Sequence, residues 1–135
     1  MAEKLKYILL ADDDTEDQDI LKTAIEDADP LTRVQTVLDG MRAVKHLANC
    51  ADTELPCLII LDYKMPLLNA AEVLEKLFGD ARYRAIPKVV WSTSMQPEHI
   101  KQCLDKGAVQ YFAKPNKASE LALMVQQCLK YAAAI

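Results

Sequence analysis

Five short apolar segments alternate along this chain with longer amphipathic segments, and the alternation restricts the folds that the chain can adopt. The pattern predicts strands near residues 5–11, 33–38, 57–62, 88–92 and 108–113, and helices near 15–28, 41–49, 69–79, 97–105 and 117–133. Strands that are apolar throughout are typical of parallel sheets buried on both faces, and parallel neighbours are joined by helical crossovers. The sequence therefore predicts an α/β fold with helices on both faces of one parallel sheet.

Polar side chains stand at the ends of four predicted strands. The first strand runs into Asp12 and Asp13, and the third ends on Asp62. The fourth ends on Ser92, and Lys114 follows the fifth. Open α/β sheets gather their functional groups at the carboxyl ends of the strands. We therefore expect acids, a hydroxyl and an amine to meet at one edge of the sheet.

These features also follow one another in a characteristic order. An acidic pair, the motif LDxxMP around Asp62, a strand-end hydroxyl and a Lys-Pro pair are spread over nearly the whole chain. In this order they resemble the receiver domain of two-component response regulators. The resemblance implies a flavodoxin-like, doubly wound sheet of five parallel strands in the order 2-1-3-4-5, flanked by five helices.

That strand order makes the first and third strands neighbours and brings Asp12, Asp13 and Asp62 into one cleft. Converging carboxylates repel one another and raise their own pKa values unless a cation neutralises them. Oxygen ligands without a nearby His or Cys favour Mg²⁺. The resemblance implies that Asp13 and Asp62 bind this ion directly and that Asp12 acts mainly through water. It also implies that the backbone carbonyl of Lys64 completes the protein ligands.

Asp62 is then the candidate nucleophile of a phosphoryl transfer. A carboxylate needs no general base to attack the phosphorus of a phosphohistidine, and it can form an acyl phosphate. Lys114 offers a positive charge, and Ser92 a hydroxyl donor, to the oxygens of the phosphoryl group. We expect a histidine kinase or a histidine phosphotransfer protein as the donor. The resemblance further implies a cis peptide between Lys114 and Pro115 that directs the amine into the cleft.

Ser92 and Tyr111 are the candidates for a switch. A contact between Ser92 and a phosphoryl group on Asp62 would draw the loop after the fourth strand toward the site. The resemblance implies that the ring of Tyr111 turns inward as this happens, and that the face of the fourth helix, fifth strand and fifth helix responds. An unknown downstream protein is expected to bind there. Apolar residues border this face, although a core position is the first expectation for most of them: Trp91, Met95, Ile100, Leu121 and Met124.

Other polar residues receive structural interpretations. Asp14 is expected to cap the first helix or to face solvent, and three further acids are expected only to favour the dipole of that helix: Glu16, Asp17 and Asp19. Helix N-caps are predicted at Asn69 and Asn116. His46 and His99 have no acidic partner at metal-ligand spacing and are predicted at the surface.

Composition excludes several classes of function. A length of 135 residues, 51% of them hydrophobic, suits one domain, so we expect a single receiver domain over residues 1–135 without an output domain. A net charge of −4 and the lack of a basic stripe argue against nucleic-acid binding. The cysteines have no metal-ligand spacing, and no apolar run is long enough to span a membrane. We expect a cytoplasmic protein with reduced thiols, either a monomer or a dimer that forms on phosphorylation.

Two other functions remain open. A pseudo-receiver would bind partners without being phosphorylated, although the intact set of Asp13, Asp62, Ser92 and Lys114 disfavours it. An aspartyl-phosphate phosphatase would need a second acid two residues after the nucleophile, where Lys64 stands. We therefore expect no enzyme activity beyond the chain's own phosphorylation and dephosphorylation. The chain also departs from the family, which usually has a glycine shortly after Met-Pro, where this chain has Asn69-Ala70-Ala71, and which more often has threonine at the hydroxyl position, where this chain has Ser92.

Overall fold

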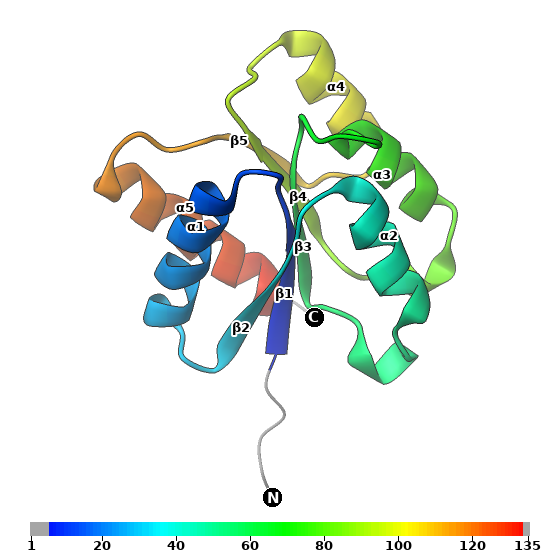
Figure 1. Cartoon of the computed structure of the whole chain (residues 1–135), viewed down its shortest axis with the longest axis horizontal. Coiled ribbons are helices and arrows are strands. Elements are labelled where there is room, and N and C mark those ends of the chain that lie inside the picture. Colours follow the sequence, from blue (N-terminus) through cyan, green and yellow to red (C-terminus); the bar gives the residue numbers. More distant parts are fainter. Residues whose placement is uncertain (1–5, 134–135) are drawn as a thin grey trace, which may run out of the picture.

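The computed structural model describes residues 6–133 and consists of a parallel sheet between two layers of helices (Figure 1). The strands are β1 (Lys6–Ala11), β2 (Thr32–Val37), β3 (Leu58–Asp62), β4 (Lys88–Ser92) and β5 (Gln110–Ala113). They lie in the order β2-β1-β3-β4-β5, which confirms the predicted fold and strand order. β1 and β3 are central neighbours, with Ala11 opposite Leu61.

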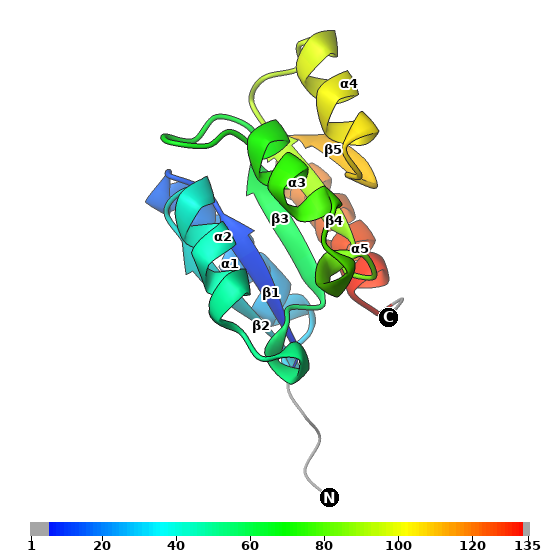
Figure 2. The same ribbon diagram turned by 90° about the vertical axis from the view of Figure 1, so that its right-hand side faces the viewer.

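Helices cover both faces of the sheet. They are α1 (Thr15–Ala28), α2 (Gly40–Asn49), α3 (Ala70–Phe78), α4 (Pro97–Asp105) and α5 (Ala118–Ala133). α1 and α5 contact each other on one face, and α2, α3 and α4 follow one another on the opposite face (Figure 1). In the view turned by 90°, α2 and α3 lie in front of the sheet (Figure 2).

Alternate residues of the central strands fill two separate hydrophobic clusters. Leu9 and Ile59 belong to the cluster beneath α2 and α3, whereas Ile8 and Ile60 belong to the cluster beneath α1 and α5. All four are fully buried. Both faces of the sheet are therefore covered by apolar side chains. Polar groups collect instead at the carboxyl ends of its strands.

Two of the three predicted helix N-caps are confirmed. Asp14 accepts hydrogen bonds from the backbone N–H groups of Glu16 and Asp17 at the start of α1. Asn69 forms a capping box with Glu72 at the start of α3. The prediction of an N-cap at Asn116 is wrong. The first helical hydrogen bond of α5 runs from Leu121 N–H to the carbonyl of the residue after Asn116, so Asn116 lies one position too early.

The predicted boundaries differ from the observed ones mainly at β5. The strand was expected from residue 108 but begins at Gln110. Gly107, with φ of 103°, and Ala108 both donate hydrogen bonds back to carbonyls of α4, so they form the end of that helix. Short 3₁₀ helices at Asp52–Glu54 and Ala81–Tyr83 were not predicted. Residue 5, the expected start of the first strand, lies outside the described residues.

α4 is attached less deeply than the other helices. Of its nine residues, only Cys103 is buried. The apolar residues around this face divide into two groups: Met95 is 49% exposed just before α4, whereas Trp91 and Met124 are core residues at 2% and 3% exposure. Ile100 and Leu121 are partly buried. Of these five apolar residues, Met95 is therefore the one that is exposed, and it lies beside α4.

The turn between β3 and α3 contains an unfavourable backbone conformation. Leu67 has a φ of 73°, in the left-handed region, although its side chain is 72% exposed. The turn closes where Ala70 N–H donates to the carbonyl of Tyr63 at 3.0 Å. Leucine therefore occupies a position whose backbone conformation favours glycine.

We predict that Leu67→Gly raises the free energy of unfolding by about 0.5–1 kcal/mol, because it relieves the left-handed strain and removes little buried surface. Urea denaturation would measure the change. Leu67→Ala is the matched control, since alanine also lacks the leucine side chain but keeps the Cβ that disfavours this φ. Equal stabilities of the glycine and alanine variants would contradict the prediction.

Candidate functional site

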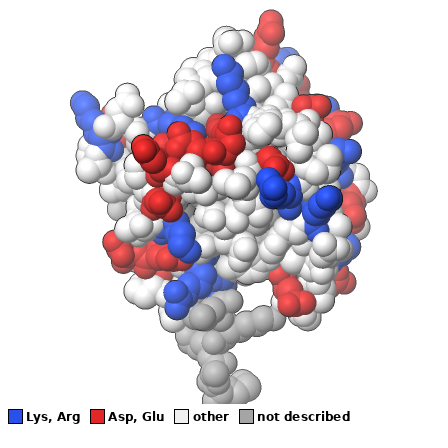
Figure 3. Space-filling view, in the orientation of Figure 1, with Lys and Arg blue, Asp and Glu red and all other residues white. Residues whose placement is uncertain are grey.

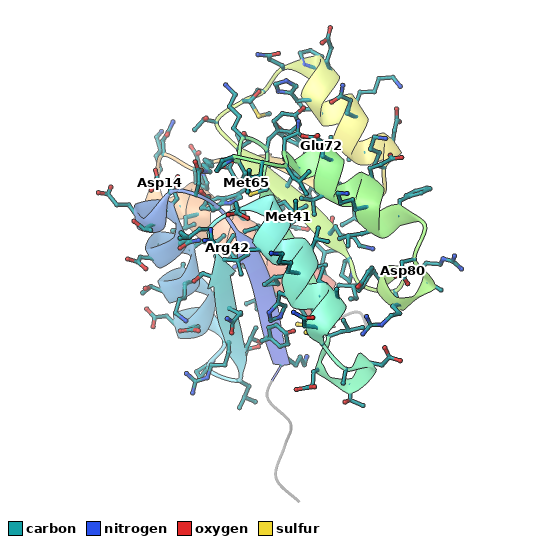
Figure 4. All side chains as sticks on the ribbon, turned by 45° about the vertical axis from the view of Figure 1, so that its right-hand side comes forward. Asp14, Met41, Arg42, Met65, Glu72 and Asp80 are labelled. Atoms are coloured by element: carbon teal, nitrogen blue, oxygen red, sulfur yellow. The ribbon has the colours of Figure 1, made fainter. Side chains whose placement is uncertain are left out.

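Three carboxylates meet at the carboxyl ends of β1 and β3. One oxygen each of Asp12, Asp13 and Asp62 lies within 4.8 Å of the others. Asp12 and Asp62 are buried, and Asp13 is exposed. Acidic side chains gather over this end of the molecule, and Asp14 and Met65 lie in the loops beside it (Figures 3 and 4). The predicted convergence of these acids is confirmed by their geometry.

Lys114 places the single ammonium of this cluster among the carboxylates. Its Nζ lies 3.0 Å from Asp12 Oδ2 and 3.4 Å from Asp62 Oδ2, and its side chain is only 11% exposed. The backbone N–H of Lys114 donates to the carbonyl of Ser92 at 2.9 Å, which fixes where the chain leaves β5. The described chain contains no cis peptide, so the predicted cis bond before Pro115 is wrong. The ammonium reaches the carboxylates with the peptide in the more stable trans form.

Asp17 is a further member of this site that the sequence interpretation missed. It was assigned only a favourable effect on the helix dipole, yet its Oδ2 lies 2.8 Å from Lys114 Nζ. Asp17 lies in the first turn of α1, and this helix begins directly after the acidic end of β1. An acid in the first turn of the helix that follows the acidic strand end was the available signal that Asp17 lies at the same end of the sheet as Asp13.

The electrostatics of the cluster favour proton uptake by the buried acids. Burial and, to a smaller extent, the nearby charge of Asp12 raise the pKa of Asp62, Lys114 lowers it, and the net result is a pKa of about 6. Burial also raises the pKa of Asp12, against the hydrogen bond that Asp14 N–H donates to it at 2.9 Å. Burial would lower the pKa of Lys114, but its hydrogen bonds and charge contacts with the surrounding carboxylates raise that pKa overall. The carboxylates therefore outnumber the positive charge available to them.

The site fits a divalent cation. Asp12 Oδ2 is buried and lacks a well-directed hydrogen bond among the described residues, although Lys114 Nζ lies 3.0 Å away. An under-coordinated carboxylate oxygen beside two further carboxylates is a donor set of hard oxygen atoms. This set matches Mg²⁺ or a similar ion better than it matches a soft metal. Lys64, the expected carbonyl ligand, lies in the loop directly after β3 with an exposed side chain.

The loop after β4 connects Ser92 to two neighbouring elements. Ser92 is buried, and its Oγ accepts a hydrogen bond from Ser94 N–H at 3.0 Å. The carbonyl of Ser94 accepts a hydrogen bond from Tyr111 Oη at 2.6 Å. Ser94 Oγ and His99 Nδ1 are 2.7 Å apart. Ser94 therefore links the predicted switch residues Ser92 and Tyr111 with α4.

Aromatic contacts continue this connection. Tyr63, the residue after Asp62, stacks on the His99 ring with centroids 3.9 Å apart, and Tyr63 Oη donates to Gln102 at 3.1 Å. Tyr111 is partly buried against the cluster beneath α2 and α3, and burial raises its pKa. The expectation that His99 is a simple surface residue is therefore wrong, because the ring is partly buried between Tyr63 and Ser94. His46 is likewise partly buried and hydrogen-bonds to Tyr7 Oη at 3.0 Å.

Features elsewhere in the described residues are simpler. The thiols of Cys50, Cys57, Cys103 and Cys128 are all free. No helix within residues 6–133 combines the length and the apolar character needed to cross a membrane.

We predict that Asp62→Asn stabilises the fold at neutral pH in the absence of divalent cations. The pKa of about 6 exceeds the ordinary 3.8, so the folded state binds the Asp62 proton more tightly and stability falls as pH rises through this interval. Asparagine removes that penalty, which is about 3 kcal/mol. Urea denaturation with EDTA should show the gain at pH 7.5 and little gain at pH 4. Asp19→Asn, at an exposed position, is the control, and a gain for Asp62→Asn that does not depend on pH would contradict the prediction.

Known proteins are similar to this chain in sequence and in fold. The profile of the response regulator receiver domain matches residues 8–126. The structure of the phosphorylated cyanobacterial phytochrome response regulator RcpA aligns with a TM-score of 0.84 and 29% identity, over 97% of this chain and 96% of that one. The Mn²⁺-bound form of response regulator Rcp1 aligns with a TM-score of 0.78 and 25% identity, over 90% of each chain.

A plant relative shows the same similarity at the level of sequence. Two-component response regulator ARR8 of Arabidopsis thaliana is 28% identical over an alignment of length 139. The alignment covers 92% of this chain and 61% of ARR8. The present chain thus spans less than two thirds of that relative. The matching profile, the fold and the clustered acids lead to one assignment: the chain belongs to the family of response regulator receiver domains of two-component systems.

Proposed function

We propose that the chain is a phosphoacceptor in a two-component system or phosphorelay, and that Asp62 takes the phosphoryl group of a histidine kinase or a histidine phosphotransfer protein. One observation carries this proposal. Asp62 is buried at the end of a central strand, clustered with Asp12 and Asp13 and 3.4 Å from the Lys114 ammonium. The similarity to RcpA, which was solved in a phosphorylated form, supports it.

Mg²⁺ is the proposed cofactor, and the similar Rcp1 was solved with Mn²⁺. Asp13 and Asp62 would hold the ion together with the backbone carbonyl of Lys64, and Asp12 would act through water. When bound, such an ion neutralises the carboxylates and the charge on the transferred phosphoryl oxygens. This balances the excess of negative charge that burial of Asp12 and Asp62 creates in the site.

The residues themselves account for the transfer step. An Asp62 carboxylate oxygen attacks the phosphorus of the phosphohistidine, an O–P bond forms, and the P–N bond to the imidazole breaks. Lys114 pairs with one phosphoryl oxygen, and the Ser92 hydroxyl donates to another. Catalysis therefore depends on positioning and charge, for which both groups are already placed near the ends of adjacent strands.

A phosphoryl group on Asp62 would alter the contacts of the loop after β4. In the structure, Ser92 Oγ accepts from Ser94 N–H. A move of Ser92 toward the phosphoryl group breaks this contact and releases Ser94, which holds His99 through its hydroxyl and Tyr111 through its carbonyl. The face of α4, β5 and α5 would then change for a downstream partner, with Met95 exposed beside it.

The alternative functions are weaker. A pseudo-receiver would not require Lys114 to be buried among three carboxylates. A phosphatase would need an acid two residues after Asp62, where the exposed Lys64 stands. We therefore propose that the chain turns over only its own phosphoryl group.

The first test is intact-protein mass after incubation with acetyl phosphate. We expect one phosphoryl adduct that requires both Mg²⁺ and Asp62, because the metal offsets the repulsion between the carboxylates and the anionic donor. Asp62→Asn should abolish the adduct, and Asp19→Asn should retain it. Absence of an adduct from the wild type, with partner binding retained, would favour the pseudo-receiver, and continuous turnover of the donor would favour the phosphatase.

A second test separates switching from phosphorylation. We predict that Tyr111→Ala retains the adduct but weakens binding of the downstream partner, because the variant lacks the ring and the contact with Ser94 while every reacting group stays in place. NMR amide shifts of residues 93–105, compared with and without phosphorylation, would measure the response of α4. Tyr111→Phe separates the ring from the hydroxyl. Equal loss of adduct and of the response in Tyr111→Ala would contradict a switch role.

A further inference from the structure

The Lys114 ammonium lies closer to Asp17 than to the proposed acceptor. Its Nζ is 2.8 Å from Asp17 Oδ2 and 3.4 Å from Asp62 Oδ2. The Asp17 side chain is 32% exposed and comes from the first turn of α1. Asp17 is not among the acids that cluster closely enough to hold a metal ion. Its contact in this site is therefore with the lysine.

Trp91 forms the wall beside the same ammonium. Lys114 Nζ lies 4.8 Å from the centroid of the Trp91 ring, within the range of a cation–π interaction. Trp91 is 2% exposed and lies in register with Asp62 on β3. Its Nε1 has no hydrogen-bond partner among the described residues, so packing alone holds the ring in place. The aromatic face and the Asp17 carboxylate thus form a cradle for the lysine.

We propose that Asp17 is a positioning residue that, together with the Trp91 ring, holds Lys114 at rest and competes with the phosphoryl group for its ammonium. This inference rests on the proposed phosphoacceptor function. To pair with a phosphoryl oxygen, the ammonium must give up an ion pair with Asp17 that is partly shielded from water. Asp17 therefore slows phosphorylation, and it limits the rate at which Asp62 accepts a phosphoryl group.

The direction of the effect follows from charge. Replacing Asp17 by asparagine weakens the resting contact of Lys114 and removes a negative charge that repels an anionic donor. Both changes favour transfer. We expect Asp17→Asn to raise the rate of phosphorylation by acetyl phosphate by about three- to tenfold, the effect of one partly buried ion pair. Glu16→Gln is the matched control, because it removes the same charge from the neighbouring, exposed position, and its rate should stay within about twofold of the wild type.

Trp91 provides a readout that does not depend on phosphorylation, because it is the only tryptophan of the chain. If Asp17 holds the ammonium against the ring, Asp17→Asn should change the fluorescence emission of Trp91 in the unphosphorylated protein. The same substitution made in a Lys114→Met background should leave the emission unchanged, because no ammonium remains to be displaced. This double-mutant cycle isolates the contact between Asp17 and Lys114.

Three results decide the proposal. A faster rate for Asp17→Asn than for Glu16→Gln, with an emission change that requires Lys114, supports it. Equal rates for the two variants, or an emission change that persists in the Lys114→Met background, overturn it. A wild type that forms no adduct would instead overturn the proposed function, and the emission cycle would still decide whether Asp17 holds Lys114.

Discussion

The burial of carboxylates beside one lysine at the ends of adjacent strands is the constraint on which the rest of this structure depends. Desolvation makes each buried charge unfavourable, and the Lys114 ammonium alone does not neutralise them. A site of this kind is poised to take up protons, a divalent cation or both. The same imbalance gives Asp62 its proposed reactivity and explains why Lys114 contacts three carboxylates rather than solvent.

The surrounding structure holds these charges in place from several elements. β1 and β3 carry the acids as central neighbours, and a backbone hydrogen bond between Lys114 and Ser92 aligns the ends of β4 and β5. The loop after β4 then connects Ser92 with α4 through Ser94 and His99. The site around Asp62 and α4 are therefore joined by a set of contacts, and we propose that a phosphoryl group on Asp62 acts through them.

Sequence patterns predicted the fold and the central acids because both depend on local features. Apolar strands that end in acids are visible directly, and the family resemblance supplied the strand order. The contact of Asp17 with Lys114 was missed because the two residues lie far apart in the sequence and on different elements, and an acid in a first turn is adequately explained by the helix dipole. His99 was misplaced for the same reason, since its stacking on Tyr63 depends on how α4 docks. The errors at Pro115 and Asn116 have a different cause. The cis peptide was expected from the family alone, and the N-cap from a residue preference, whereas the hydrogen bond of Leu121 N–H places the start of α5 one residue later.

The shallow attachment of α4 has a consequence for the cooperativity of the fold. A helix that buries only Cys103 contributes little apolar surface to the core, so detaching it forfeits a small part of the free energy of folding. α4 can therefore open as a sub-global unit while the sheet and the other helices remain folded. The helix that we propose to carry the signal is thus weakly held to the core, and its opening without phosphorylation would set the background activity of the proposed switch.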